Sequence, residues 1–126
     1  MFKVVLSGLP LIARILISFL FVFAALSNIN HAKQLITDIS QKAVPLASMV
    51  FYFGVSVELI SGLCLMVGYK VNLAIPVLVI FIILATLLFH DFWHAEGEFY
   101  RVQCLSFVTN LSTIGALLLL MAWYAK

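Results

Sequence analysis

Two charged residues interrupt long apolar runs of the sequence, and they are the first candidates for chemistry. Glu58 lies in the run 51–70, where Gly54, Glu58 and Gly62 recur every four residues and therefore share one face of a helix. Arg14 lies within the first apolar run. Because a lone carboxylate at membrane depth costs several kcal/mol, we expect Glu58 to face protein or water and to pair with a cation. Arg14 is the obvious partner.

Counting residues along the expected helices places the two charges at one depth. Arg14 lies as far before Ser27 as Glu58 lies after Pro45. At 1.5 Å per residue, both should lie roughly 20 Å from the membrane face that carries the longer loops. This predicts an Arg14–Glu58 ion pair. Two roles stay open: a structural pair that fixes how the first two helices dock, or a proton or cofactor site, because charges inside a membrane tend to be functional.

A second polar set precedes the last apolar run, and it comprises His90, Asp91, His94, Glu96 and Glu98. We expect this set to lie near Asn110 and His31. The spacing of His90 and His94 places two imidazoles on one side of a helical turn, which is a weak pattern for a metal pair. Polar residues that cap a helix end at the membrane interface are the commoner explanation. We therefore predict no metal site, and His90 and His94 are the candidates if there is one.

These residues supply the candidate sites. Glu58 and His90 are the candidates for catalysis, and the candidates for ligand binding or buried polar contacts are Arg14, Glu58, His90, Asp91 and Asn110. Cys64 and Cys104 should lie near opposite membrane faces, much farther apart than a disulfide allows. The sequence contains no haem-ligand pair, iron–sulfur cysteine motif or nucleotide-binding loop, so any redox cofactor must come from outside this chain.

The composition determines the class of protein that must position these residues. The chain has 126 residues, of which 65% are hydrophobic and 10% charged, and its mean hydropathy is +1.21. That is more apolar surface than a soluble domain of this size can bury, which predicts an integral membrane protein. Because about 20 apolar residues cross a bilayer as a helix, the length allows four crossings. The net charge of +2 gives no indication of nucleic-acid binding.

We predict an all-α, polytopic membrane protein: a single domain, residues 1–126, forming an antiparallel bundle of four transmembrane helices. The expected spans are 4–27, 46–69, 73–90 and 105–124. The first is expected to be retained rather than cleaved as a signal peptide, because it is too long and contains Arg14. The polar segment from Asn28 to Gln41 is predicted to be a loop or an interfacial helix. The segment from His90 to Gln103 is predicted to be an interfacial connection.

The order of several motifs resembles the DoxX family along essentially the whole chain. The residues that carry the resemblance are Arg14, the segment Val57-Glu58-Leu59-Ile60-Ser61-Gly62-Leu63 followed by Gly68-Tyr69-Lys70, the block from Ala85 to Trp93 with His90-Asp91-Phe92-Trp93, and Asn110-Leu111 before Gly115. The resemblance implies a small bacterial membrane protein of four helices, with polar family positions at Arg14, Glu58, His90 and Asn110. The chain departs from the family pattern at Ser61, which is often glycine, and at Thr109, which is often lysine.

The resemblance also implies a role near redox chemistry, because some relatives are linked to membrane oxidoreductase complexes and the DoxD branch to thiosulfate oxidation with quinone as acceptor. Under this hypothesis the chain is a subunit of, or accessory to, a quinone- or thiol/sulfur-linked system. A quinone would bind near His90 and Asn110, with Glu58 and Arg14 buffering a proton. The alternative is a non-catalytic scaffold, assembly subunit or small transporter. Whether the chain is an enzyme stays open.

The expected location is a bacterial inner membrane, with the lipid bilayer, subunits of a redox complex and further copies of the chain as the expected contacts. Orientation is weakly determined, because the cations are equally divided between the short-turn face (Lys3, Lys70, Lys126) and the long-loop face (Lys33, Lys42, Arg101). Acidic residues accompany the cations on the long-loop face. We therefore predict that both termini are cytoplasmic.

Overall fold

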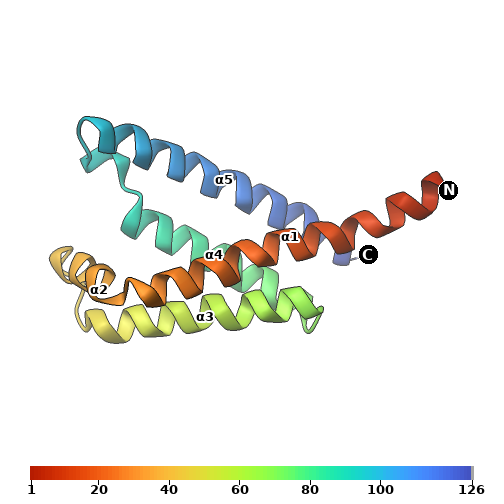
Figure 1. Ribbon diagram of the computed structural model, residues 1–126, viewed down its shortest axis with the longest axis horizontal. Helices are drawn as coiled ribbons and strands as arrows, with labels where there is room; N and C mark the ends of the chain where they lie inside the picture. The colour runs from red at the N-terminus through yellow and green to blue at the C-terminus, as the bar shows by residue number, and fades with distance from the viewer. Residues whose placement is uncertain (126) are drawn as a thin grey trace.

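The computed structural model describes residues 1–125, which form five α-helices and one short 3-10 helix (Figure 1). Their bounds are α1 Phe2–Asn30, α2 Ala32–Gln41, α3 Ala47–Val67, α4 Val71–Phe89, η1 Phe92–His94 and α5 Glu98–Tyr124. Four segments are long and apolar enough to cross a membrane: α1, α3, α4 continued to His94, and α5. The predicted all-α fold with four spans is confirmed. Lys126, assigned from the sequence to the short-turn face, lies outside the described residues.

The two polar connections are more helical than expected. The segment after Asn28 contains α2, so of the two alternatives, a loop or a helix, the helix is observed. This helix forms because Leu35, Ile36 and Ile39 follow helical spacing and pack with the start of α3. At the other connection, α5 begins at Glu98, so the prediction that the connection continues to Gln103 is wrong. Glu98 lies in the first turn, where a carboxylate favours the positive end of the helix dipole.

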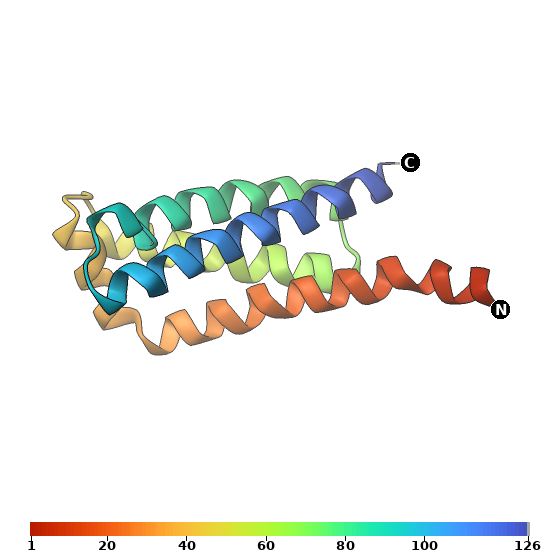
Figure 2. The same ribbon diagram turned by 90° about the horizontal axis from the view of Figure 1, so that it is seen from above.

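The four long helices run antiparallel to their neighbours and form a ring in the order α1, α3, α4, α5 (Figures 1 and 2). The main apolar core lies toward the end with the short turn between α3 and α4, and it includes Phe21, Leu65, Ile75, Leu78 and Leu117. A second core, built around Ala25, Ile39, Phe51 and Val55, lies where α2 covers α1 and α3. The core is therefore divided between the two ends of the bundle.

The two glycines within α3, Gly54 and Gly62, lie against two different helices. Gly62 faces α1, where a Cβ atom would lie 3.1 Å from Phe21 Cβ and 3.3 Å from Val22 Cγ2. Only a residue without a side chain permits this close approach of helices, as is common in membrane packing. Gly54 faces α4, where a Cβ atom would lie 3.7 Å from Phe81.

The helices α1 and α3 are staggered along the bundle axis. The N-terminal part of α1 extends well past the end of α3 in both views (Figures 1 and 2). None of its residues before Ser18 is buried, and nothing lies within 4 Å of a Cβ atom built at Gly8. At the other end, α2 packs beside the start of α3. This stagger determines which polar side chains can meet.

Candidate functional site

Arg14 lies at the short-turn end of the bundle. Its Nη1 donates a hydrogen bond to Tyr124 Oη at 2.9 Å, and its guanidinium carbon lies 5.8 Å from the centre of the Tyr124 ring. The guanidinium also packs on Gly68, where a Cβ atom would lie 3.1 Å from Nη1. Gly68 ends α3, so the cation lies beside the negative end of that helix dipole. Arg14 therefore connects α1, the end of α3 and the C-terminal turn of α5.

Glu58 lies near the middle of α3 and faces the bundle interior, with 5% of its surface exposed. Its partner is Asn28 near the end of α1, whose Nδ2 donates to Glu58 Oε1 at 3.4 Å. Glu58 therefore faces protein rather than lipid, as expected, but its partner is a carboxamide and not a cation. Asn28 comes from a segment whose polar composition indicated a connection, whereas α1 continues through it to Asn30.

The predicted ion pair between Arg14 and Glu58 is wrong. The guanidinium packs on Gly68, which lies roughly 15 Å farther along α3 than Glu58 at 1.5 Å per residue. The depth count failed because it assumed that α1 and α3 end level at the long-loop face. The start of α3 instead packs beside α2, and α1 is displaced toward the short-turn end.

Two hydrogen bonds join α4 to α5 near the long-loop end. Asn110 Nδ2 donates to Thr86 Oγ1 at 2.9 Å, and Thr86 is 4% exposed. One turn farther along α4, His90 Nδ1 lies 2.8 Å from Gln103 Oε1. Because a carboxamide oxygen only accepts, this contact requires hydrogen on Nδ1. Asn110 and His90 thus occupy successive contacts of one helix pair rather than a shared site.

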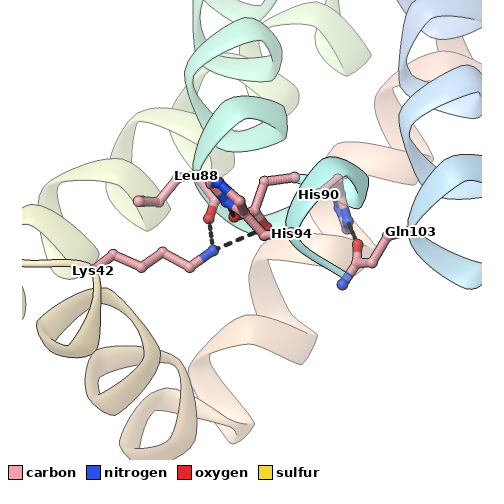
Figure 3. A network of polar contacts seen from close by, with 6 residues as sticks. Lys42, Leu88, His90, His94 and Gln103 are labelled. Atoms are coloured by element: carbon pink, nitrogen blue, oxygen red, sulfur yellow. Dashed lines mark hydrogen bonds and ion pairs between the residues drawn. The ribbon is translucent and has the colours of Figure 1, made fainter. Parts of the chain in front are cut away.

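The long-loop face carries a further group of polar contacts, shown in Figure 3. Lys42, from the connection after α2, hydrogen bonds to the Leu88 carbonyl at the end of α4, and its Nζ lies 3.3 Å from Asp91 Oδ1. Asp91 Oδ2 lies 3.1 Å from His94 Nδ1. Asp91, His94, Glu96 and Gln103 line an open polar depression of about 530 Å³. His31 does not join this group but contacts the Ser27 carbonyl of its own helix at 2.8 Å.

The helical pairing expected for His90 and His94 is wrong. The helix α4 ends at Phe89, and the chain turns at His90 before the short helix η1, so the two imidazoles are not on one helical face. His90 contacts Gln103 while His94 contacts Asp91 (Figure 3). Among residues 1–125 there is no group of three or more histidine, cysteine, aspartate or glutamate side chains that could hold a metal ion. Cys64 lies in the last turns of α3, and Cys104 in the first turns of α5.

An apolar pocket of about 430 Å³ lies among α2, α3 and α4. Its walls include Gly54 and Phe53 from α3, Phe81 and Leu84 from α4, and Ile39 from α2. Asn28, the partner of Glu58, is the one lining residue with a polar side chain. The pocket thus combines an apolar interior with a carboxamide that is bonded to a buried carboxyl group. Sequence reasoning did not predict this pocket, because it depends on how α2 and α4 pack beside α3.

Several partners were not among the candidate site residues, namely Asn28, Lys42, Thr86, Gln103 and Tyr124. Thr86 carried a signal, since it shares a helical face with His90. Nothing in the sequence distinguished Tyr124 from an ordinary aromatic residue at the membrane interface. The five candidate residues that the sequence did identify, Arg14, Glu58, His90, Asp91 and Asn110, lie in five separate contacts and do not converge on a single site.

Comparison with known proteins agrees with this architecture. Neither the curated proteins nor the solved structures contain a match to the chain. The DoxX family model matches residues 9–91, which is more than half of the chain and includes Arg14, Glu58 and His90. Asn110 follows the matched region. The match, together with four helices able to cross a membrane, shows that this multi-pass membrane protein belongs to the DoxX family.

Proposed function

We propose that this chain is a subunit of a quinone-linked redox system in a bacterial inner membrane, and that the quinone occupies the apolar pocket with its ring beside Asn28, the hydrogen-bond partner of Glu58. The observation that carries the proposal is the pocket itself, in which one carboxamide interrupts an apolar wall. Its volume of about 430 Å³ lies within the ordinary range of small-molecule sites.

The chemistry of the lining residues suits a lipophilic molecule with a polar head. Phenylalanine, leucine and valine side chains would contact an isoprenoid tail. The Asn28 carboxamide could donate to a quinone oxygen, and the Glu58 carboxyl bonded to it could supply a proton. Reduction of a quinone to a quinol consumes two electrons and two protons, of which Glu58 would supply one and water the other. The electrons would come from a reduced cofactor of a partner subunit.

This proposal moves the quinone away from the position expected from the sequence. His90 and Asn110 are bonded to Gln103 and Thr86 across the contact between α4 and α5. Arg14 lies at the far end of α3 and cannot share a proton with Glu58. Glu58 is therefore the proton-carrying candidate of the proposed site, and Asn28 is its hydrogen-bonding candidate.

Filling the pocket tests the proposal. A Cβ atom at Gly54 makes only ordinary contact with Phe81, so Gly54→Ala should be tolerated, whereas the larger side chain of Gly54→Leu should occupy the pocket. We expect Gly54→Leu in lipid nanodiscs to lose at least tenfold in affinity for a short-chain quinone, measured by equilibrium binding. A tenfold loss corresponds to ~1.4 kcal/mol of binding free energy.

The matched control is Gly115→Leu on α5, where nothing lies within 4 Å of the added Cβ. This variant should bind quinone like the unmodified chain. Equal quinone binding by Gly54→Leu and the control, or no quinone binding by the unmodified chain, would exclude the pocket as the site.

A second candidate function is supported by the hydrogen-bond pairs. Arg14, Glu58, Asn110 and His90 each contact a neighbouring helix, which suits a non-catalytic scaffold whose polar residues hold the bundle together. Glu58→Gln distinguishes the two functions, because glutamine can still accept from Asn28 but cannot carry the proton. The redox function predicts lower quinone-linked turnover of the complex at unchanged thermal stability. The scaffold function predicts unchanged turnover per assembled complex.

A further inference from the structure

The short-turn end of the bundle carries positive charge at the level where lipid headgroups should lie. Tyr69 and Tyr124 are at this end, and aromatic residues of this kind are enriched at membrane interfaces. The guanidinium of Arg14 contacts Tyr124 and Gly68, which places it at the same level. Arg14 is therefore an interfacial cation, not a charge at the centre of the membrane.

Within residues 1–125, the cations at this end have no acidic partner. Lys70 follows Gly68 by two residues and lies over the ring of Tyr69, with its Nζ 5.6 Å from the ring centre. Lys3 lies on the same helical face of α1 as Arg14. All five acidic residues of the chain are described, and they lie either in the middle of α3 or toward the long-loop end. At that opposite end, Lys42 is paired with Asp91.

The turn between α3 and α4 places the backbone of Lys70 within a short distance of the Arg14 guanidinium. Gly68 and Lys70 both adopt positive φ, of 83° and 49°, so the chain reverses within a few residues. The guanidinium packs on Gly68, and two residues of chain span at most about 7 Å. One phosphate group is thus able to contact both cations.

The donor geometry of Arg14 suits a phosphate. Tyr124 takes one hydrogen of the guanidinium, and Nε is buried without a partner among residues 1–125. The side chain stays partly exposed, so an anion could approach the Nη edge. A planar guanidinium binds phosphate oxygens through two parallel hydrogen bonds.

We infer that the short-turn end binds the phosphodiester headgroup of an anionic membrane phospholipid between Arg14 and Lys70. The lipid is the source of the phosphate that the observations favour, because both cations lie at the level of the interfacial aromatic residues. A cationic side chain near a membrane surface contributes about fivefold to such binding. The inference does not depend on the quinone pocket, which lies at the other end of α3.

The test compares nanodiscs of phosphatidylcholine with nanodiscs of a phosphatidylcholine–phosphatidylglycerol mixture. Native mass spectrometry should detect phosphatidylglycerol retained on the released protein, and thermal unfolding should occur at a higher temperature in the mixture. Lys70→Gln, at an exposed position that should not affect folding, is expected to weaken retention about fivefold. Arg14→Lys keeps the charge but removes the planar fork, so its retention should lie between those of the unmodified chain and Arg14→Gln.

The control is Lys33→Gln, an exposed cation on α2 at the opposite end. It should retain phosphatidylglycerol like the unmodified chain. Equal loss in Lys33→Gln and Lys70→Gln, or equal retention of both lipids by the unmodified chain, would overturn the inference. It would also be overturned if inorganic phosphate alone stabilised the protein in phosphatidylcholine in a manner dependent on Lys70, because the site would then bind free phosphate.

Discussion

At the residue scale, Gly68 shows how one position both ends a helix and holds a charge. Its φ of 83° allows Tyr69 N–H to donate to the Cys64 carbonyl at 2.8 Å, which closes the end of α3. Its missing side chain leaves room for the Arg14 guanidinium. A residue with a Cβ atom at this position would strain the left-handed backbone and would require the guanidinium to shift by a few tenths of an ångström.

Replacement of Gly68 tests this double role. We expect Gly68→Ala to lower the free energy of unfolding by about 1–3 kcal/mol, through backbone strain and displacement of the guanidinium. The measurement is reversible unfolding in detergent micelles, with thermal unfolding as a second readout. Gly115→Ala is the control: Gly115 lies in a regular helix with open space around it, so alanine there should not destabilise. Equal stability of the two variants would contradict this account.

The sequence identified the important charges better than it identified their partners. Glu58 was expected to avoid the lipid, and it is 5% exposed. Asn28 was assigned to a connection and Tyr124 to the end of the last span, because composition shows neither the end of α1 nor the depth of the last turn of α5. Pairing between helices depends on relative shift and rotation, which hydropathy does not contain.

At the element scale, the contact between α4 and α5 relies on polar bonds more than on apolar burial. Only Leu117 and Leu120 of α5 are buried, and both lie toward its C-terminal end. Toward the long-loop end, the described contacts between these helices include the bonds of Asn110 with Thr86 and His90 with Gln103. These bonds determine the register of α5 along α4 where apolar packing is sparse.

A double-mutant cycle measures how much the Asn110–Thr86 hydrogen bond contributes to the stability of the bundle. Thr86→Val and Asn110→Leu should each destabilise the bundle, and their coupling free energy should be about 0.6 kcal/mol and at most ~1.7 kcal/mol, the range for hydrogen bonds between transmembrane helices. The control cycle combines Thr86→Val with Thr113→Val, since the Thr113 hydroxyl bonds to the Thr109 carbonyl of its own helix. Additive free energies in the first cycle would show that the Asn110–Thr86 bond does not stabilise the contact.

The elements themselves were largely predictable. Four apolar runs gave four helices, because backbone groups in lipid must be bonded within each segment. The start of α5 was placed too late, since Arg101 and Gln103 are polar but have good helix propensity. The stagger of α1 was not predictable, because it follows from the fit of Gly62 against Phe21 and from the packing of α2 beside α3.

At the scale of the whole molecule, the position of Arg14 changes the balance of charge between the two ends. Counted with Lys3 and Lys70, it gives the short-turn end a group of cations without acidic neighbours. The cations of the long-loop end, by contrast, share it with Asp38, Asp91, Glu96 and Glu98. Cation excess close to the membrane favours the cytoplasmic side.

Reporter fusions test the resulting orientation. We expect a C-terminal fluorescent protein to be fluorescent and a C-terminal alkaline phosphatase to be inactive, because both ends of the chain should lie in the cytoplasm. A phosphatase inserted in the connection between α2 and α3 should be active, which provides the internal control. The opposite pattern would show that the short-turn end faces away from the cytoplasm and that the charge argument is wrong.

The unequal lengths of the four spans affect how the protein fits its surroundings. The helix α4 has 19 residues and α1 has 29, which correspond to roughly 28 Å and 43 Å at 1.5 Å per residue. A bilayer of ordinary thickness matches α4 closely but is too thin for α1. Hydrophobic mismatch is therefore largest at α1 and its neighbour α5, which has 27 residues, so thickening the bilayer with longer acyl chains should strain α4 while sheltering more of α1.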